Sequence, residues 1–191
     1  MRSISDIRAI QINNEHRSIA KIRFEKNIHK IGDRTCRKDL DTFYWGFLGE
    51  AIYEAMYGQR EATAHDKFDY LIQSPSSGRI YKIDAKTNNW TKNRNPHSNA
   101  NILLPIRDNE NFPEVDYFCF MWHNIESGLM FKVGHIDKHT FFANSVYIKK
   151  GQCLPNTKYP SDGNCRTMKI EKLLELSYEN QAHRCKPQET Y

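Results

Sequence analysis

Two strand-like runs on either side of a turn place the strongest constraint on how this chain folds. Residues Ile80 to Lys86 alternate polar and apolar side chains, which is the two-residue period of a half-buried strand. Residues 67–72 also have the composition of a strand, and the five residues 74–78, Ser-Pro-Ser-Ser-Gly, are typical of a turn. The sequence therefore predicts a β-hairpin.

This hairpin brings acidic residues together. Asp84 and Lys86 are two residues apart, so their side chains point to the same side of the strand. If the two strands pair symmetrically about Ser76 and Ser77, Asp69 lies directly opposite Asp84. Two directly opposed carboxylates repel each other unless a cation lies between them. Their hard oxygen atoms suit Mg²⁺ or Mn²⁺ better than zinc, so we expect a divalent-cation site.

A third carboxylate, Glu50, lies in a helix that we expect over residues 43–57. The apolar residues of this segment recur at helical spacing, and Glu50 lies at the edge of the apolar stripe that they form. A carboxylate in that position needs a partner, because burying an unpaired charge is costly. Gly46 and Gly49 weaken the helix and allow it to approach the sheet closely.

A helical Glu, then an Asp, then Asp84-x-Lys86 resembles the motif of the PD-(D/E)XK, or restriction-endonuclease-like, nuclease superfamily. Asp84-x-Lys86 is the one place in the chain where an acidic residue stands two positions before a lysine, and Phe68 stands where the family name has proline. The resemblance covers residues 43–135. It implies an α/β fold with an αβββαβ core, in which helices flank a central mixed β-sheet.

The resemblance also implies divalent-metal-dependent cleavage of phosphodiester bonds. Asp69 and Asp84 would be metal ligands, Glu50 the helical acid, and Lys86 the residue that orients or activates the attacking water. The carbonyl of Ala85 would add a further oxygen ligand to Mg²⁺, for which Mn²⁺ could substitute. Cations nearby would disfavour the ammonium form of Lys86, and its two roles, water-orienting donor and general base, stay open.

The remaining elements are expected from periodicity. We expect a first helix over residues 13–30, a third core strand, a fully buried fourth strand, a fifth strand, a short helix and a final amphipathic helix. In chain order the last five span Asn101 to Pro105, Val115 to Trp122, Leu129 to Ile136, Asp137 to Ala143 and Met168 to Tyr178. The segment Phe131 to Ile136, with Phe141, Ala143 and residues 149–151, is similar to the closing segment of several phage-type members of the superfamily.

With 39% hydrophobic residues, the chain of 191 residues can bury one core. We expect a single nuclease-like domain over residues 1–191, with an N-terminal helical extension (1–42), a core (43–136) and a C-terminal helical and basic segment (137–191). No apolar run approaches the length of a membrane span, no signal peptide is visible, and five scattered cysteines form no disulfide framework. These features favour a cytoplasmic protein without a membrane partner. The resemblance to phage-type members of the superfamily implies a phage-encoded protein in a bacterial host.

The net charge of +5 permits binding to nucleic acid. The expected contact residues precede the Glu50 helix or lie in the polar loop after residue 86, which carries no acidic residue as far as Arg107; they are Arg34, Arg37, Lys38, Lys92 and Arg94. The family analogy suggests DNA as the partner, with a homodimer as one way to cut it. The basic face of the first helix is either solvated or in contact with phosphates.

The sequence therefore predicts a Mg²⁺-dependent deoxyribonuclease, most simply an endonuclease. The alternative is a catalytically inactive protein with the same fold that binds nucleic acid without cutting it. A third hypothesis, a zinc-stabilised interaction protein, would use Cys153, Cys165, His183 and Cys185, but these residues contain no Cys-x-x-Cys pair.

Overall fold

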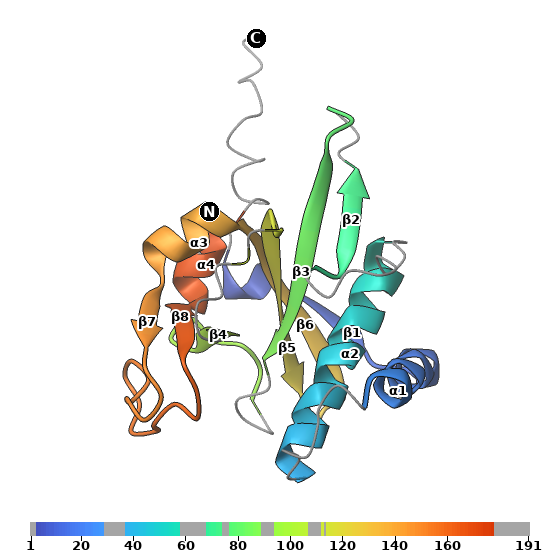
Figure 1. Ribbon diagram of the computed structural model, residues 1–191, viewed down its shortest axis with the longest axis horizontal. Helices are drawn as coiled ribbons and strands as arrows, with labels where there is room; N and C mark the ends of the chain where they lie inside the picture. The colour runs from blue at the N-terminus through green and yellow to red at the C-terminus, as the bar shows by residue number, and fades with distance from the viewer. Residues whose placement is uncertain are drawn as a thin grey trace.

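The computed structural model describes residues 3–28, 37–57, 68–73, 77–88, 94–106, 112 and 114–177 (Figure 1). The described helices are η1 (Ile4–Asp6), α1 (Asn14–Asn27), α2 (Arg37–Tyr57), α3 (Lys138–Asn144) and α4 (Ile170–Leu176). The described strands are β1 (Arg8–Gln11), β2 (Tyr70–Gln73), β3 (Ile80–Asn88), β4 (Asn101–Pro105), β5 (Tyr117–Asn124), β6 (Leu129–Asp137), β7 (Val146–Ile148) and β8 (Cys165–Lys169).

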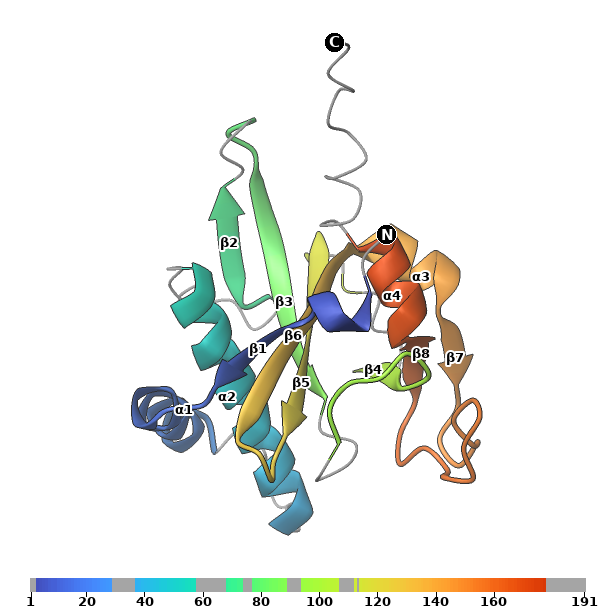
Figure 2. The same ribbon diagram turned by 180° about the vertical axis from the view of Figure 1, so that it is seen from behind.

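Five strands form a central mixed sheet in the order β1-β6-β5-β3-β2. Strands β3 and β5 are parallel, and the other neighbours in this sheet are antiparallel. Helices α1 and α2 lie on one side of the sheet, and a second sheet of order β4-β8-β7 lies with α3 and α4 on the other side (Figures 1 and 2). The chain is therefore a mixed α/β protein whose central sheet is flanked by helices, as expected.

The side chains of β5 point alternately to the two faces of the central sheet, and each face is covered by its own hydrophobic core. Phe118 and Phe120 pack in the core shared with β4, β6, α3 and α4, whereas Cys119 and Met121 pack in the core shared with α1 and α2. Because both faces of β5 are covered, seven of its eight residues are buried. The expectation of a fully buried strand is confirmed, as is the assignment of Cys119 to the core.

The predicted hairpin and its register are confirmed. Tyr70 pairs with Ile83 and Gln73 pairs with Ile80, so the strands are related symmetrically about residues 76 and 77. Strand β2 begins later than expected, at Tyr70, and the N–H of the preceding Asp69 donates a hydrogen bond to the carbonyl of Ile83 at 2.9 Å. The ladder therefore ends before the expected Asp69–Asp84 pair, and Asp69 lies just beyond it at the edge of β3.

The strand expected at residues 101–105 exists, but its expected position as the third strand of the core sheet is wrong. It pairs with β8 in the second sheet, because the edge of β3 that it would have used is occupied by β5 in parallel register. The last helix is also shorter than expected: residues 165–169 form β8, and α4 begins at Ile170. The αβββαβ order of the superfamily thus stays a prediction.

The N-terminal segment contributes a strand as well as the expected helix. Helix α1 begins after Asn13, whose side chain accepts a hydrogen bond from the N–H of His16 at 2.9 Å. Strand β1 pairs with β6 at the edge of the central sheet, and it is largely exposed, so no alternating pattern marked it in the sequence. Among the described helices, none has both the length and the apolar character needed to cross a membrane.

Candidate active site

The hairpin joins Asp69 to the strand that carries Asp84 and Lys86. The Asp69 carboxylate accepts a hydrogen bond from the N–H of Ala85 at 2.7 Å. The ladder between β2 and β3 ends at the Tyr70–Ile83 pair, so this N–H lies just beyond the last pair of strand residues. In an extended strand the N–H and C=O of one residue point to the same side, and the Ala85 carbonyl therefore faces the same edge as Asp69.

Asp84 and Lys86 point to the same side of β3, as their spacing predicts. The Lys86 Nζ lies 2.7 Å from Oδ1 of Asp84. The Asp84 side chain is 5% exposed and that of Lys86 is 30% exposed. The ammonium group therefore compensates a buried carboxylate from the more exposed side of the site.

Helix α2 brings Glu50 to the sheet through a close approach at Gly49. A Cβ atom on Gly49 would lie 1.8 Å from the Oγ1 of Thr87, so any other residue here would have to displace the Thr87 side chain of β3. Gly46 differs, because a Cβ atom there would have open space around it. The expected close approach is confirmed for Gly49 alone. Glu50, the next residue, has a side chain that is 16% exposed.

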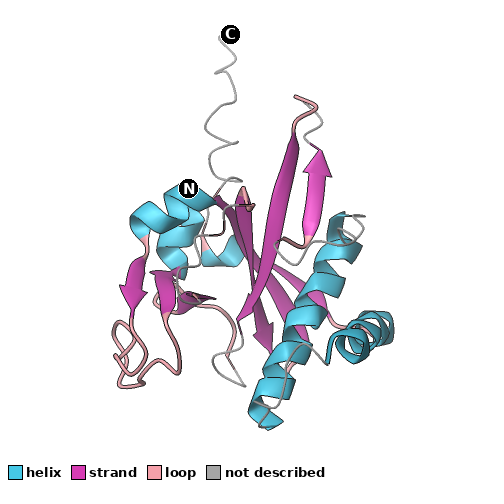
Figure 3. Cartoon of the chain, in the orientation of Figure 1, coloured by secondary structure: helices cyan, strands magenta, loops and turns pink. Residues whose placement is uncertain are grey.

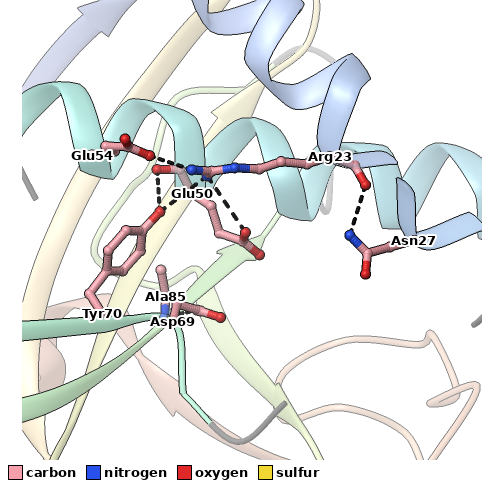
Figure 4. Close-up of polar contacts among 7 residues, drawn as sticks. All are labelled: Arg23, Asn27, Glu50, Glu54, Asp69, Tyr70 and Ala85. Carbon is pink, nitrogen blue, oxygen red and sulfur yellow. Dashed lines mark hydrogen bonds and ion pairs between the residues drawn. The ribbon is translucent and has the colours of Figure 1, made fainter. Parts of the chain in front are cut away.

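Arg23 of α1 is the partner of Glu50. Its guanidinium lies 3.8 Å from the Glu50 carboxylate, forms an ion pair with Glu54, and donates to the hydroxyl of Tyr70 at 3.4 Å. The Tyr70 hydroxyl in turn donates to the backbone carbonyl of Glu50 at 2.7 Å. Figure 4 shows Arg23 reaching from α1 to α2, and Glu50 beside the strand segments of Asp69 and Ala85. The side chain of Glu50 is therefore paired with Arg23, and its backbone carbonyl is bonded to Tyr70.

Arg23 was not expected to be buried, because the basic face of its helix was expected to be solvated or in contact with phosphates. Ile22 and Ile28 are 51% and 44% exposed, whereas His16, Ala20 and Arg23 are buried. These three residues are spaced by four and then three positions, so they lie on one face of α1. Their spacing was visible in the sequence, but two of the three are polar.

The charges at the site shift the pKa of Asp69 and of Lys86. Burial raises the pKa of Asp69 well above its usual value, the negative charges of Glu50 and Asp84 raise it further, and Lys86 and the Ala85 N–H oppose them. Burial alone would lower the pKa of Lys86, but Asp84, Asp69 and Glu50 together outweigh it and raise the pKa. The expected lowering of the Lys86 pKa depends on cations bound beside it, so it stays a prediction.

The donor atoms suit a hard divalent cation, since three carboxylates and a backbone carbonyl are all oxygen ligands. Burial, and after it the charges of Glu50 and Asp84, raise the pKa of Asp69, and a bound cation would offset both effects. Within the described part of the chain, however, no three or more His, Cys, Asp or Glu side chains lie close enough together to hold a metal ion. Asp84 is engaged with Lys86, and Glu50 with Arg23.

The expected DNA-contact residues are only partly described. Arg94 is exposed, and its backbone carbonyl accepts a hydrogen bond from Nε1 of Trp122 at 2.8 Å. Arg37 and Lys38 lie in the first turn of α2, where the structure describes the backbone alone. Arg34 and Lys92 lie outside the described residues.

The four residues of the zinc hypothesis are also only partly described. Cys153 is exposed and Cys165 is buried, whereas His183 and Cys185 lie outside the described residues. The buried Cys165 packs against Ile148 and Leu154 in a small apolar cluster of the second sheet. In the structure this cysteine is thus a core residue.

Comparisons of the chain with protein-family models, with curated proteins and with solved structures each found no match.

Proposed function

We propose that this protein is a divalent-metal-dependent nuclease of the PD-(D/E)XK type that hydrolyses phosphodiester bonds in DNA, most simply as an endonuclease. The observation that carries the proposal is the hydrogen bond between Asp69 and the Ala85 N–H, which sets a second acid beside Asp84 and Lys86. The helix that carries Glu50 packs on the same strand. These elements follow one another in the chain as the superfamily motif requires, within a mixed sheet.

Each residue of the site has a role in this proposal. Asp69, Asp84, Glu50 and the Ala85 carbonyl would hold Mg²⁺, with Mn²⁺ as a substitute. A bound cation would polarise the scissile phosphate and stabilise the charge that develops in the transition state. Lys86 would act on the attacking water, either by orienting it through a donated hydrogen bond or by accepting its proton.

A second candidate function is supported by the ion pairs of the site. Lys86 neutralises Asp84, and Arg23 pairs with Glu54 and Glu50, so buried carboxylates have cationic partners from the protein itself. This arrangement would also serve a catalytically inactive protein that has the same fold and binds nucleic acid through exposed basic residues such as Arg94. The two functions differ in whether DNA is cut.

The test is incubation of the purified protein with supercoiled, linear duplex, single-stranded and branched DNA in Mg²⁺, Mn²⁺ or EDTA. Cleavage in Mg²⁺ or Mn²⁺ that EDTA abolishes supports the nuclease, and the preferred form of DNA separates nicking, end-dependent and junction-specific enzymes. Retardation of the DNA in a gel with no cleavage in either metal would favour the inactive binding protein.

A further inference from the structure

The connection between β7 and β8, residues 149–164, is a hairpin with a fixed backbone. The N–H of Gly151 donates to Ser161 at 2.8 Å, the N–H of Ser161 to Gln152 at 2.8 Å, and the N–H of Leu154 to Tyr159 at 3.0 Å, each to the backbone carbonyl. Leu154 is 2% exposed and packs with Ile148 and Cys165. Side chains on this connection are therefore presented from a defined scaffold.

Apolar surface is exposed on this hairpin and on the strand before it. Tyr159 is 70% exposed, Val146 is 56% exposed and Tyr147 is 43% exposed. The backbone of Tyr159 is held at both ends, because its N–H donates to Oγ1 of Thr157 at 3.2 Å and its carbonyl accepts from Leu154. Exposed aromatic rings on a backbone that the fold holds in place are typical of a binding surface.

Three lysines lie on the same connection between β7 and β8. Lys149, Lys150 and Lys158 are exposed, and none of them forms an ion pair with another described residue. No acidic residue occurs from Lys138 to Ser161, and Asp162 is the one acidic residue before Glu171. The surface therefore attracts an anionic partner.

Arg166 of β8 differs from these lysines because its guanidinium is used by the fold. It donates to the carbonyls of Phe142 and Ser145 at 2.9 and 3.2 Å, and it lies over the ring of Phe142. Its role is to tie β8 to α3. On residues 149–164 the basic side chains are therefore those of the three lysines.

We propose that Tyr147, Lys149, Lys150, Lys158 and Tyr159, here called the β7–β8 surface, bind an unpaired nucleic-acid strand. Tyrosine rings stack on bases whatever the sequence, and lysines pair with the phosphates between them. The combination of rings and lysines suits a strand whose bases are unstacked better than a duplex, whose bases are enclosed. The choice of nucleic acid as the partner rests on the proposed function. The proposed binding does not require that the protein cut DNA.

The β7–β8 surface has a fixed relation to the candidate active site. The connection between β7 and β8 extends from the second sheet, on the side of the molecule away from α1 and α2 (Figures 1 and 3). Strand β4 connects it to the central sheet, because β4 pairs with β8 and the N–H of Leu103 donates to Oδ1 of Asn88 at 2.7 Å. Asn88 ends the strand that carries Asp84 and Lys86. A strand bound at this surface would thus be held at a set distance from the proposed site.

The experiment is fluorescence anisotropy of labelled oligodeoxythymidine, oligouridine and duplex DNA of about 20 nucleotides, longer than the usual site on such a surface, in EDTA. We expect Tyr159→Ala to weaken binding of the unpaired strands about tenfold, and Tyr159→Phe, which keeps the ring, to bind as the wild type. Lys149→Gln with Lys150→Gln should weaken binding and reduce the slope of log affinity against log salt by about 1.4.

The matched control is Arg8→Gln with Arg79→Gln, which removes the same charge from two exposed side chains outside both α1 and the β7–β8 surface. The control should bind like the wild type, and circular dichroism should show that all variants are folded. Tighter binding to oligodeoxythymidine or to oligouridine would tell whether DNA or RNA is the preferred source of the strand, and either supports the proposal.

Four results would overturn the proposal: wild-type affinity in the Tyr159→Ala and lysine variants, an equal loss in the Arg8 and Arg79 control, tighter binding to duplex than to unpaired strands, or binding to phosphatidylserine vesicles without binding to oligonucleotides. Because EDTA prevents metal-dependent cutting, none of these results depends on nuclease activity. A protein that binds through this surface but cuts no DNA would refute the proposed function and leave this inference standing.

Discussion

The carboxylate of Asp69 lies 2.7 Å from the backbone nitrogen of Ala85, so it occupies the edge of β3 at the point where β2 begins. This contact satisfies a backbone N–H that lies beyond the ladder of paired residues. It also holds a carboxylate in the field of Glu50 and Asp84, which burial and charge both penalise. Such a position is costly for stability and useful for binding a cation.

Asp69→Asn should therefore separate stability from function. The amide keeps an oxygen that can accept from the Ala85 N–H, and it removes a crowded negative charge. We expect urea unfolding near neutral pH to give a free energy of unfolding equal to that of the wild type or about 1 kcal/mol higher, with cleavage lost. Asp69→Ala, which also removes the acceptor, should be less stable than Asp69→Asn. The reverse order would mean that the carboxylate stabilises the fold.

Lys86→Ala should damage turnover more than DNA affinity. If Lys86 acts on the attacking water, its loss removes an interaction with the reacting atoms and leaves the DNA-contact surfaces intact. We expect single-turnover cleavage to fall about 10²-fold or more, within the range of acid–base contributions, and the dissociation constant in Ca²⁺ to change little. Equal losses of rate and affinity would indicate a lysine that serves binding alone.

Arg23→Ala should destabilise the protein strongly. The Arg23 side chain is 10% exposed, and its removal leaves Glu54 and Glu50 without this cationic partner. We expect the free energy of unfolding to fall by about 3 kcal/mol. Lys21→Ala in the same helix is the control: its ion pair with Glu25 joins side chains that are 71% and 60% exposed, so it should change stability by less than about 0.5 kcal/mol. Similar effects of the two changes would contradict the proposed role of Arg23.

His123 should make stability depend on pH. Burial, and to a lesser degree the charge of Arg17, lower the pKa of His123 from 6.5 to about 4. As pH falls from about 6.5 to about 4, the unfolded chain takes up a proton that the folded protein does not, so the free energy of unfolding decreases over this window and this group causes no further loss below it.

The measurement is urea unfolding of the wild type and of His123→Phe, which keeps a ring against Trp45. Between about pH 7 and pH 4.5, the variant should lose about 2 kcal/mol less stability than the wild type. Parallel curves for the two proteins would show that His123 titrates normally in the folded state.

The hairpin could be predicted from the sequence because the residues that specify its strands and its turn are close together in the chain. Alternation along residues 80–86 and the turn residues before them predicted both strands and the register of Tyr70–Gln73 with Ile80–Ile83, and this register brings Asp69 to the edge of β3 at Ala85. The continuous apolar run of β5 similarly marked a strand covered on both faces. Each of these features depends on residues that are close together in the chain.

Other features depend on contacts that the sequence pattern does not specify. The parallel pairing of β3 with β5 determines that residues 101–105 join a different sheet, and neither strand shows this by itself. In the sequence, Arg23 is one of several charged residues of a basic helix. Its partners Glu54 and Glu50 lie on α2, and only the packing of the two helices brings them together. Strand β1 lacks alternation because it lies at an exposed sheet edge.

The most direct test of the central claim is cleavage of supercoiled plasmid in Mg²⁺ by the wild type, by Asp84→Asn and by Glu126→Gln. Glu126 is an exposed acidic residue in the turn after β5, so its variant loses the same charge away from the site. The proposed nuclease predicts cutting by the wild type and Glu126→Gln, and a loss of about 10²-fold or more in a folded Asp84→Asn protein. Cutting by Asp84→Asn at the wild-type rate, or a wild type that binds the plasmid and never cuts it, would contradict the claim.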